Sequence, residues 1–182
     1  MDNSPGAAIV AQAGGVRVEA VRGLWAASLR YFDPAGSFAA AVLESIGLPL
    51  AQPLSAAQSR ASHDAQVILA WRSPTDTLLL CDGQAAFAEI EQRLLAAADG
   101  CMVDQTGAFR VFRVQGQRAR EVLQRMGATT AIPGLGQARG GRMAEVHVLT
   151  ICIEPGEFLL VIERVYADHL TEWIRATLAD FN

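Results

Sequence analysis

The sequence contains no lysine, and each of its 15 basic residues is arginine. Without lysine the chain cannot form a Schiff base, present the lysine of a phosphate-binding P-loop, or use a lysine general base. Histidine is also scarce, with 3 residues, and no serine lies at the centre of a Gly-x-Ser-x-Gly motif. These gaps lower the expectation of an enzyme that acts alone.

Strong positive charge and long apolar runs are missing as well. The net charge of −4 argues against nucleic acid as a partner, because phosphate binding needs a concentrated cationic surface. No apolar run approaches the ~20 residues of a membrane-spanning helix. With 51% hydrophobic and 19% charged residues, the 182-residue chain has the composition of a globular protein. We expect no nucleic acid and no membrane partner.

Cysteine is limited to Cys81, Cys101 and Cys152, each in or beside an apolar run. None forms a Cys-x-x-Cys pair, so neither a zinc site nor dithiol redox chemistry is supported. No basic residue precedes Arg17, so the start does not resemble a secretory signal. We expect a cytoplasmic protein with three buried, reduced thiols.

The first part of the chain has few regular patterns. Residues 1–15 are small and turn-prone and predict a flexible N-terminal arm, followed by a single domain over residues 16–182. A helix capped by Ser37 is expected to end at Gly47. Residues 49–66 show no period and predict a long surface connection.

The second half alternates apolar runs, which predict strands, with amphipathic segments, which predict helices. The last helix carries an apolar stripe expected to be buried on a sheet: Tyr166, Leu170, Trp173, Ile174, Leu178 and Phe181. The expected strands are 67–71, 77–81, one extended segment that starts at 101–103 and resumes at 109–114, 145–153 and 157–162. The expected helices are 84–98, 117–126 and one from Tyr166 to Phe181.

Two hairpins, each followed by a helix, align without gaps, with residues 74–80 over residues 155–161. Both segments have a turn proline, an acidic residue two positions later and an aliphatic strand. The order ββαβαββα predicts an α+β fold with one antiparallel sheet, helices on one face and a ferredoxin-like topology.

Arginines provide the candidate ligand-binding groups. The glycine-rich stretch 134–142 lacks the Gly-x-Gly-x-x-Gly spacing of a dinucleotide site, but Arg139 and Arg142 could bind an anion or a folate carboxylate. The alternative is a flexible loop before the next strand. No residue is assigned a catalytic role or a metal.

Aromatic and arginine side chains provide the candidate partner interface. Trp25, Tyr31 and Phe32 lie close together in the sequence, and Arg110 and Arg113 interrupt an apolar strand on opposite faces. Such residues are enriched at protein interfaces. The alternatives are core aromatics and arginines that solubilise an edge strand.

Several segments resemble sarcosine oxidase gamma subunits. Residues 71–80 read WRSPTDTLLL and resemble a "WLGPDEWLLL" hairpin of that family. Residues 103–123 are similar to its "V-D-x-S … G-x-x-A-R-x-V-L" segment, residues 157–173 to its closing "F-x-L-x-V-x-R-S-F-A … L-W-x-W-L" stretch, and residues 47–49 to its early "LG-x-x-LP". The chain departs from these patterns at Ser73, Thr77 and Val165.

The resemblance implies a fold related to the folate-binding part of the glycine-cleavage T-protein. It also implies a non-catalytic accessory subunit that packs with alpha and beta subunits in a heterotetramer that demethylates sarcosine oxidatively. The cofactors FAD, FMN, NAD and tetrahydrofolate would then belong to the parent complex and none to this chain. The alternative is a stand-alone folate-binding or one-carbon-transfer protein of T-protein-like fold.

Overall fold

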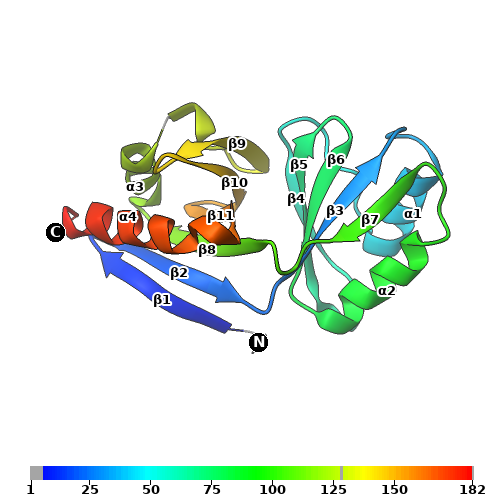
Figure 1. Ribbon diagram of the computed structural model, residues 1–182, viewed down its shortest axis with the longest axis horizontal. Coiled ribbons are helices and arrows are strands. Elements are labelled where there is room, and N and C mark those ends of the chain that lie inside the picture. Colours follow the sequence, from blue (N-terminus) through cyan, green and yellow to red (C-terminus); the bar gives the residue numbers. More distant parts are fainter. Residues whose placement is uncertain (1–5, 128, 182) are drawn as a thin grey trace. The chain divides into compact units, whose positions relative to one another are not determined.

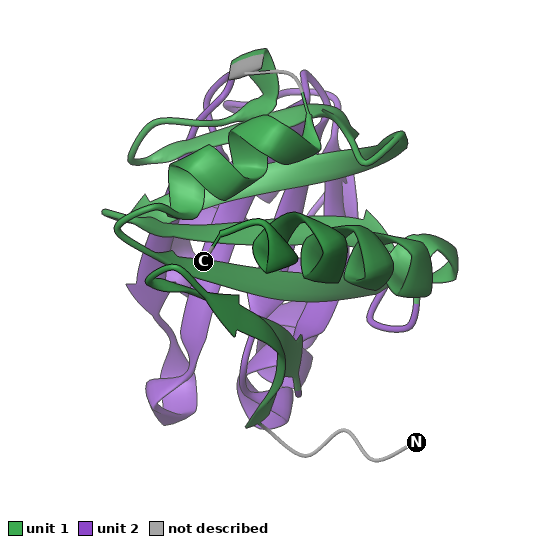
Figure 2. Cartoon of the chain, turned by 90° about the vertical axis from the view of Figure 1, so that its left-hand side faces the viewer, with its two compact units in different colours: residues 1–22, 108–182 green, residues 23–107 purple. Residues whose placement is uncertain are grey.

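The computed structural model describes residues 6–127 and 129–181, which fall into two compact units (Figures 1 and 2). We call residues 23–107 the inserted unit, and residues 1–22 together with 108–182 the split unit. Each unit has its own antiparallel sheet and its own hydrophobic core. The single domain expected over residues 16–182 therefore contains two compact bodies.

The inserted unit consists of β3 (Trp25–Tyr31), α1 (Ser37–Ile46), β4 (Ala56–Arg60), a 3₁₀ turn (Ser62–Asp64), β5 (Gln66–Ser73), β6 (Asp76–Cys81), α2 (Gln84–Leu94) and β7 (Gly100–Asp104). The strands form a sheet in the order β4-β5-β6-β3-β7, with every neighbouring pair antiparallel. Leu29, Leu69 and Leu79 point to one face, where they join Phe38 of α1 and Ile90 of α2 in one buried cluster. Both helices therefore cover the same face of this sheet.

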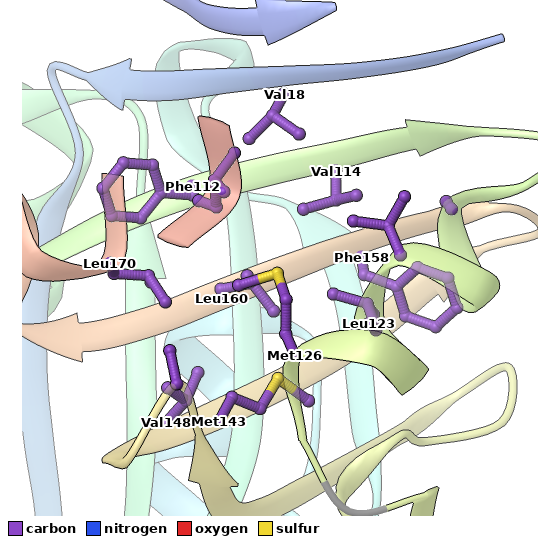
Figure 3. Close-up of a cluster of buried hydrophobic side chains, with 14 of the residues drawn as sticks. Val18, Phe112, Val114, Leu123, Met126, Met143, Val148, Phe158, Leu160 and Leu170 are labelled. Atoms are coloured by element: carbon purple, nitrogen blue, oxygen red, sulfur yellow. The ribbon is translucent and has the colours of Figure 1, made fainter. Parts of the chain in front are cut away.

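The split unit consists of β1 (Gly6–Ala13), β2 (Val16–Arg22), β8 (Phe109–Gly116), α3 (Ala119–Met126), a 3₁₀ turn (Thr129–Ala131), β9 (Gln137–Met143), β10 (Val146–Glu154), β11 (Glu157–Glu163), a 3₁₀ turn (Arg164–Tyr166) and α4 (Ala167–Ala179). Its antiparallel sheet has the order β1-β2-β8-β11-β10-β9. Figure 3 shows the core, where Phe112 and Leu160 of the sheet lie with Leu123 of α3 and Leu170 of α4.

The two units have the same topology. In the inserted unit, β3 is followed by α1, the three strands β4-β5-β6, α2 and finally β7, which pairs with β3. In the split unit, β8 is followed by α3, β9-β10-β11 and α4, and β2 from the beginning of the chain takes the position of β7 beside β8. The aligned segments 74–80 and 155–161 lie at equivalent turns, between β5 and β6 and between β10 and β11.

The α+β class and the antiparallel, ferredoxin-like arrangement are confirmed. Strands β5, β6, β3 and β7 with helices α1 and α2 have the ferredoxin-like order, extended by β4 at one edge. The prediction of one sheet is wrong, because the strands divide between two. The predicted order ββαβαββα is also incomplete, because each unit has strands that the sequence pattern does not reveal.

Three segments predicted to lack regular structure contain strands. The predicted arm contains β1, whose residues 6–13 pair with β2, while residues 1–5 lie outside the described residues. The predicted connection 49–66 contains β4 and a 3₁₀ turn, and the predicted loop 134–142 contains most of β9. Main-chain pairing with β2, β5 and β10 orders these segments without an apolar pattern of their own.

The last helix buries a narrower stripe than predicted. Leu170, Ile174 and Leu178, four residues apart, are buried, and so is Phe181 just beyond the end of the helix. Tyr166 lies in the preceding 3₁₀ turn and Trp173 on the flank of the helix, with exposed fractions of 43% and 40%. No helix in the described part of the chain has the length and apolar character needed to span a bilayer.

Candidate partner-binding surface

A hollow of about 690 Å³ opens on the inserted unit where β3 ends and β7 begins. Side chains from these strands and from the β5–β6 turn line it, among them Arg30, Tyr31, Phe32, Asp76, Asp99 and Cys101. Two of the predicted interface aromatics, Tyr31 and Phe32, thus reach the same concave site.

The three aromatic candidates have different environments. Phe32 is 91% exposed, although its N–H donates to the main-chain oxygen of Asp99 across a distance of 3.0 Å. Tyr31 is buried, and its hydroxyl lies 3.3 Å from that of Thr77. Trp25 is half-buried and packs against the core cluster. Phe32 is therefore the aromatic side chain that remains available to a partner.

Asp99, which lines this hollow, stabilises the N-terminus of α1. Its Oδ2 accepts hydrogen bonds from the backbone N–H and the hydroxyl of Ser37, at 2.9 and 3.0 Å. Because helix N-termini have unsatisfied N–H groups, this carboxylate caps α1 from a distant part of the chain. The prediction that Ser37 itself caps the helix is wrong: Gly36 is the capping residue, and Ser37 begins the helix.

Asp76, the other carboxylate of the hollow, is also engaged. It accepts a 2.6 Å hydrogen bond from the hydroxyl of Ser28, which is fully buried, and pairs with Arg72 at 3.5 Å. Arg30 donates through Nε to the same Ser28 hydroxyl at 3.4 Å. These polar groups hold β3 against the β5–β6 hairpin.

The predicted arginine pair on β8 lies in the split unit. Arg113 is half-buried and forms an ion pair with Glu157 at 3.1 Å, and Arg110 is exposed near the beginning of the strand. Because β8 lies between β2 and β11, it is an interior strand, and the alternative of edge-strand solubilisation is wrong. Arg113 contributes to cross-strand pairing, whereas Arg110 remains accessible.

The predicted anion pair lies on β9. Arg139 donates to the main-chain oxygen of Thr130 at 3.5 Å, and Arg142 donates to the main-chain oxygen of Glu145 at 2.7 Å and pairs with its carboxylate at 3.2 Å. Strand residues three apart point to opposite faces of a sheet. The two guanidiniums therefore do not converge on a single folate carboxylate, and this pair does not fit that ligand.

The described residues, 6–127 and 129–181, contain no group of three or more His, Cys, Asp or Glu side chains that could hold a metal ion.

The three thiols differ in accessibility. Cys81 and Cys152 are buried, and burial raises the pKa of both thiols. The prediction of three buried thiols is wrong for Cys101, which is exposed on β7 and lines the hollow. The apolar run that predicts β7 does not show that it is an edge strand, which is why the sequence did not reveal this surface.

We expect iodoacetamide at pH 8 to label the native protein at Cys101 first. Cys81 and Cys152 should react only after denaturation, because they are buried and a raised pKa leaves less reactive thiolate at this pH. Mass spectrometry of alkylated peptides measures the order. Equal labelling of all three cysteines in folded protein would contradict the described burial, and a Cys101→Ser variant that takes up no label when native is the control.

The comparisons with known proteins identify relatives. Residues 31–180 match the family model described as "Sarcosine oxidase, gamma subunit family". No curated protein sequence matches the chain.

Solved structures share the fold. A chain of the heterotetrameric sarcosine oxidase from Corynebacterium sp. U-96 in complex with pyrrole 2-carboxylate matches with a TM-score of 0.77 and 18% identity, over 95% of this chain and 88% of that one. The glycine cleavage system aminomethyltransferase T from Bartonella henselae matches with a TM-score of 0.68 and 16% identity, over 89% of this chain and 46% of that one. The second relative is thus about twice as long as the region it shares.

Proposed function

Because this chain belongs to the sarcosine oxidase gamma subunit family, we propose that it is a non-catalytic accessory subunit of a heterotetrameric, sarcosine oxidase-like flavoenzyme. The observation that carries the proposal is the family match over residues 31–180, which includes parts of both compact units. The first of the matched solved structures is named as a heterotetramer, which supports assembly with other subunits.

The chemistry of the hollow supports a docking role over a catalytic one. A general acid or base must be free to exchange a proton with a substrate. Asp99 is bound to the N-terminus of α1, and Asp76 is bound to Ser28 and Arg72. The most exposed aromatic side chain there is Phe32, an anchor suited to packing against a partner.

In this proposal the alpha and beta subunits bind FAD, FMN, NAD and tetrahydrofolate and oxidise sarcosine. This chain binds none of these cofactors and contributes surface and rigidity to the complex. We place the complex in the cytoplasm, where the three thiols would remain reduced.

Co-expression tests the proposal. The tagged chain should co-purify with candidate alpha and beta subunits and elute with them in gel filtration, and only the assembled complex should oxidise sarcosine. A stable subunit contact covers on the order of 1,600 Å² in total. We expect the complex to remain assembled at micromolar concentrations in gel filtration. Separate elution at all concentrations would refute the accessory role.

The chain alone should not turn over sarcosine, and millimolar tetrahydrofolate should leave its thermal midpoint unchanged. A ligand that binds the native state raises the midpoint by mass action. A clear upward shift would instead favour the stand-alone folate-binding alternative.

A further inference from the structure

Strand β7 forms an open edge of the sheet in the inserted unit. It pairs with β3 on one side and is the last strand in the sheet order, so no strand of the described chain pairs with its other side. At the two ends of the β3–β7 pairing, Gln105 N–H donates to Ala26 O and Phe32 N–H donates to Asp99 O. These two bonds determine which residues of β7 direct their main-chain N–H and C=O groups toward β3. Because hydrogen-bonded and non-bonded pairs alternate along antiparallel strands, the main-chain groups of Gly100, Met102 and Asp104 point outward.

This edge carries little of the protection that natural sheets give to exposed strands. Edge strands are commonly guarded by charged residues, proline or bulges. Strand β7 reads GCMVD, with its one charge at the last position and no register shift against β3. On the face of the hollow, Cys101 is exposed and Val103 is 40% exposed. The edge is therefore suited to pair with another strand.

The split unit shows how the same topological position is completed. There the strand equivalent to β7 is β2, and β1 pairs with its outer side from Gly6 to Ala13. The sheet of the split unit has six strands for this reason, and that of the inserted unit has five. The missing counterpart of β1 defines what would fill the edge, namely one extended segment of a few residues.

The hollow lies beside the first residues of β7. Gly100 and Cys101 line it together with Phe32 and Arg30. Where a peptide joins a sheet edge, main-chain hydrogen bonds provide affinity and pockets for alternate side chains provide specificity. The edge and the hollow together offer both elements of this mode of recognition.

We propose that an extended segment of a partner subunit pairs with the outer edge of β7 as a sixth strand and places an apolar side chain against Phe32 in the hollow. This inference rests on the proposed accessory function and names the surface that performs it. The occupant is a polypeptide strand with alternating apolar side chains.

The test compares proline substitutions on the two edges of one sheet, in the full chain co-expressed with the alpha and beta subunits. Met102→Pro removes an outward N–H from β7 and places a ring at the edge. Gln58→Pro is the matched control on the opposite edge strand, β4. Trp71 N–H donates to Ser55 O and Ala61 N–H donates to Ala65 O, so by the same alternation the main-chain N–H and C=O groups of Gln58 point outward. Circular dichroism and the thermal midpoint establish that each variant is folded.

We expect Met102→Pro to weaken binding of the subunits by about ten-fold or more, through lost hydrogen bonds and a steric clash at the edge. Gln58→Pro should bind like wild type. Phe32→Ala should also weaken binding, without a change in thermal midpoint, because this side chain is 91% exposed. If Met102→Pro does not fold, binding by Phe32→Ala tests the proposed surface instead. In the wild-type complex, amide exchange of residues 100–104 should slow and Cys101 should resist alkylation.

Binding of Met102→Pro equal to that of Gln58→Pro, with unchanged exchange at residues 100–104 in the complex, would overturn the assignment of this edge and leave the accessory function intact. A homodimer that is detected by light scattering and abolished by Met102→Pro would show that the proposed occupant is wrong, because a second copy of this chain would then pair with β7. If the wild-type chain binds no subunit at all, the proposed function fails.

Discussion

Replacing Gly100 with alanine is expected to destabilise the inserted unit by about 3 kcal/mol. A Cβ atom at this position would lie 2.4 Å from Cγ of Phe38, 2.6 Å from its Cδ1 and 2.7 Å from the main-chain oxygen of Arg30. Phe38 is fully buried between α1 and the sheet, so its ring has no free space into which to move. The midpoint of urea denaturation measures the change.

Gly107→Ala is the matched control in the same unit. Apart from Gly107 itself and its two neighbours in the chain, no residue has a heavy atom within 4 Å of a Cβ built at Gly107. The substitution should change the free energy of unfolding by no more than about 0.5 kcal/mol. Equal urea midpoints for the two variants would show that β7 does not approach Phe38 as described.

Leu160→Ala is expected to destabilise the split unit by about 3–4 kcal/mol. Leu160 lies in the interior strand β11, is fully buried, and belongs to the cluster shared with α3 and α4 (Figure 3). Truncation removes buried apolar surface and leaves a cavity that the surrounding sheet can close only in part. Thermal and urea denaturation should both report the loss.

The control is Leu135→Ala, at a leucine of the same unit that is 61% exposed. This change should alter stability by about 0.5 kcal/mol or less. A Leu160→Ala variant as stable as Leu135→Ala would contradict the described core.

The elements that sequence patterns predicted well are those with buried faces. The interior strands β5, β6, β8, β10 and β11 carry aliphatic runs because side chains must fill a core. Turn prolines at residues 74 and 155 locate the two hairpins. Helix α2 shows its stripe of Phe87, Ile90 and Leu94 for the same reason.

Most of the strands that were missed are edge strands, although the interior strand β3, which reads WAASLRY, was not predicted either. Strands β1, β4 and β9 all lie at sheet edges, where one side of the strand has no neighbour in the sheet. β4 reads AAQSR and β9 reads QARGGRM, so neither shows the alternation by which a strand is recognised. The fourth edge strand, β7, has an apolar sequence and was predicted, although its position at an edge was not.

The candidate surface was predictable in part. The sequence drew attention to Tyr31 and Phe32 as neighbouring aromatics, and both line the hollow. Asp99 and Cys101 join them through the pairing of β3 with β7, which sequence spacing does not encode. Likewise, the sequence did not reveal that Arg139 and Arg142 lie in one strand, where their side chains point to opposite faces of the sheet.

Because residues 23–107 separate the two parts of the split unit in the sequence, they determine the order in which the two sheets can form during synthesis. β2 pairs with β8, and all of residues 23–107 emerge from the ribosome between them. At about 5–20 residues per second, the nascent β1–β2 hairpin waits on the order of ten seconds for β8, while the contiguous residues 23–107 can already close their own core. The segment translated first is therefore among the last to find its place in a sheet.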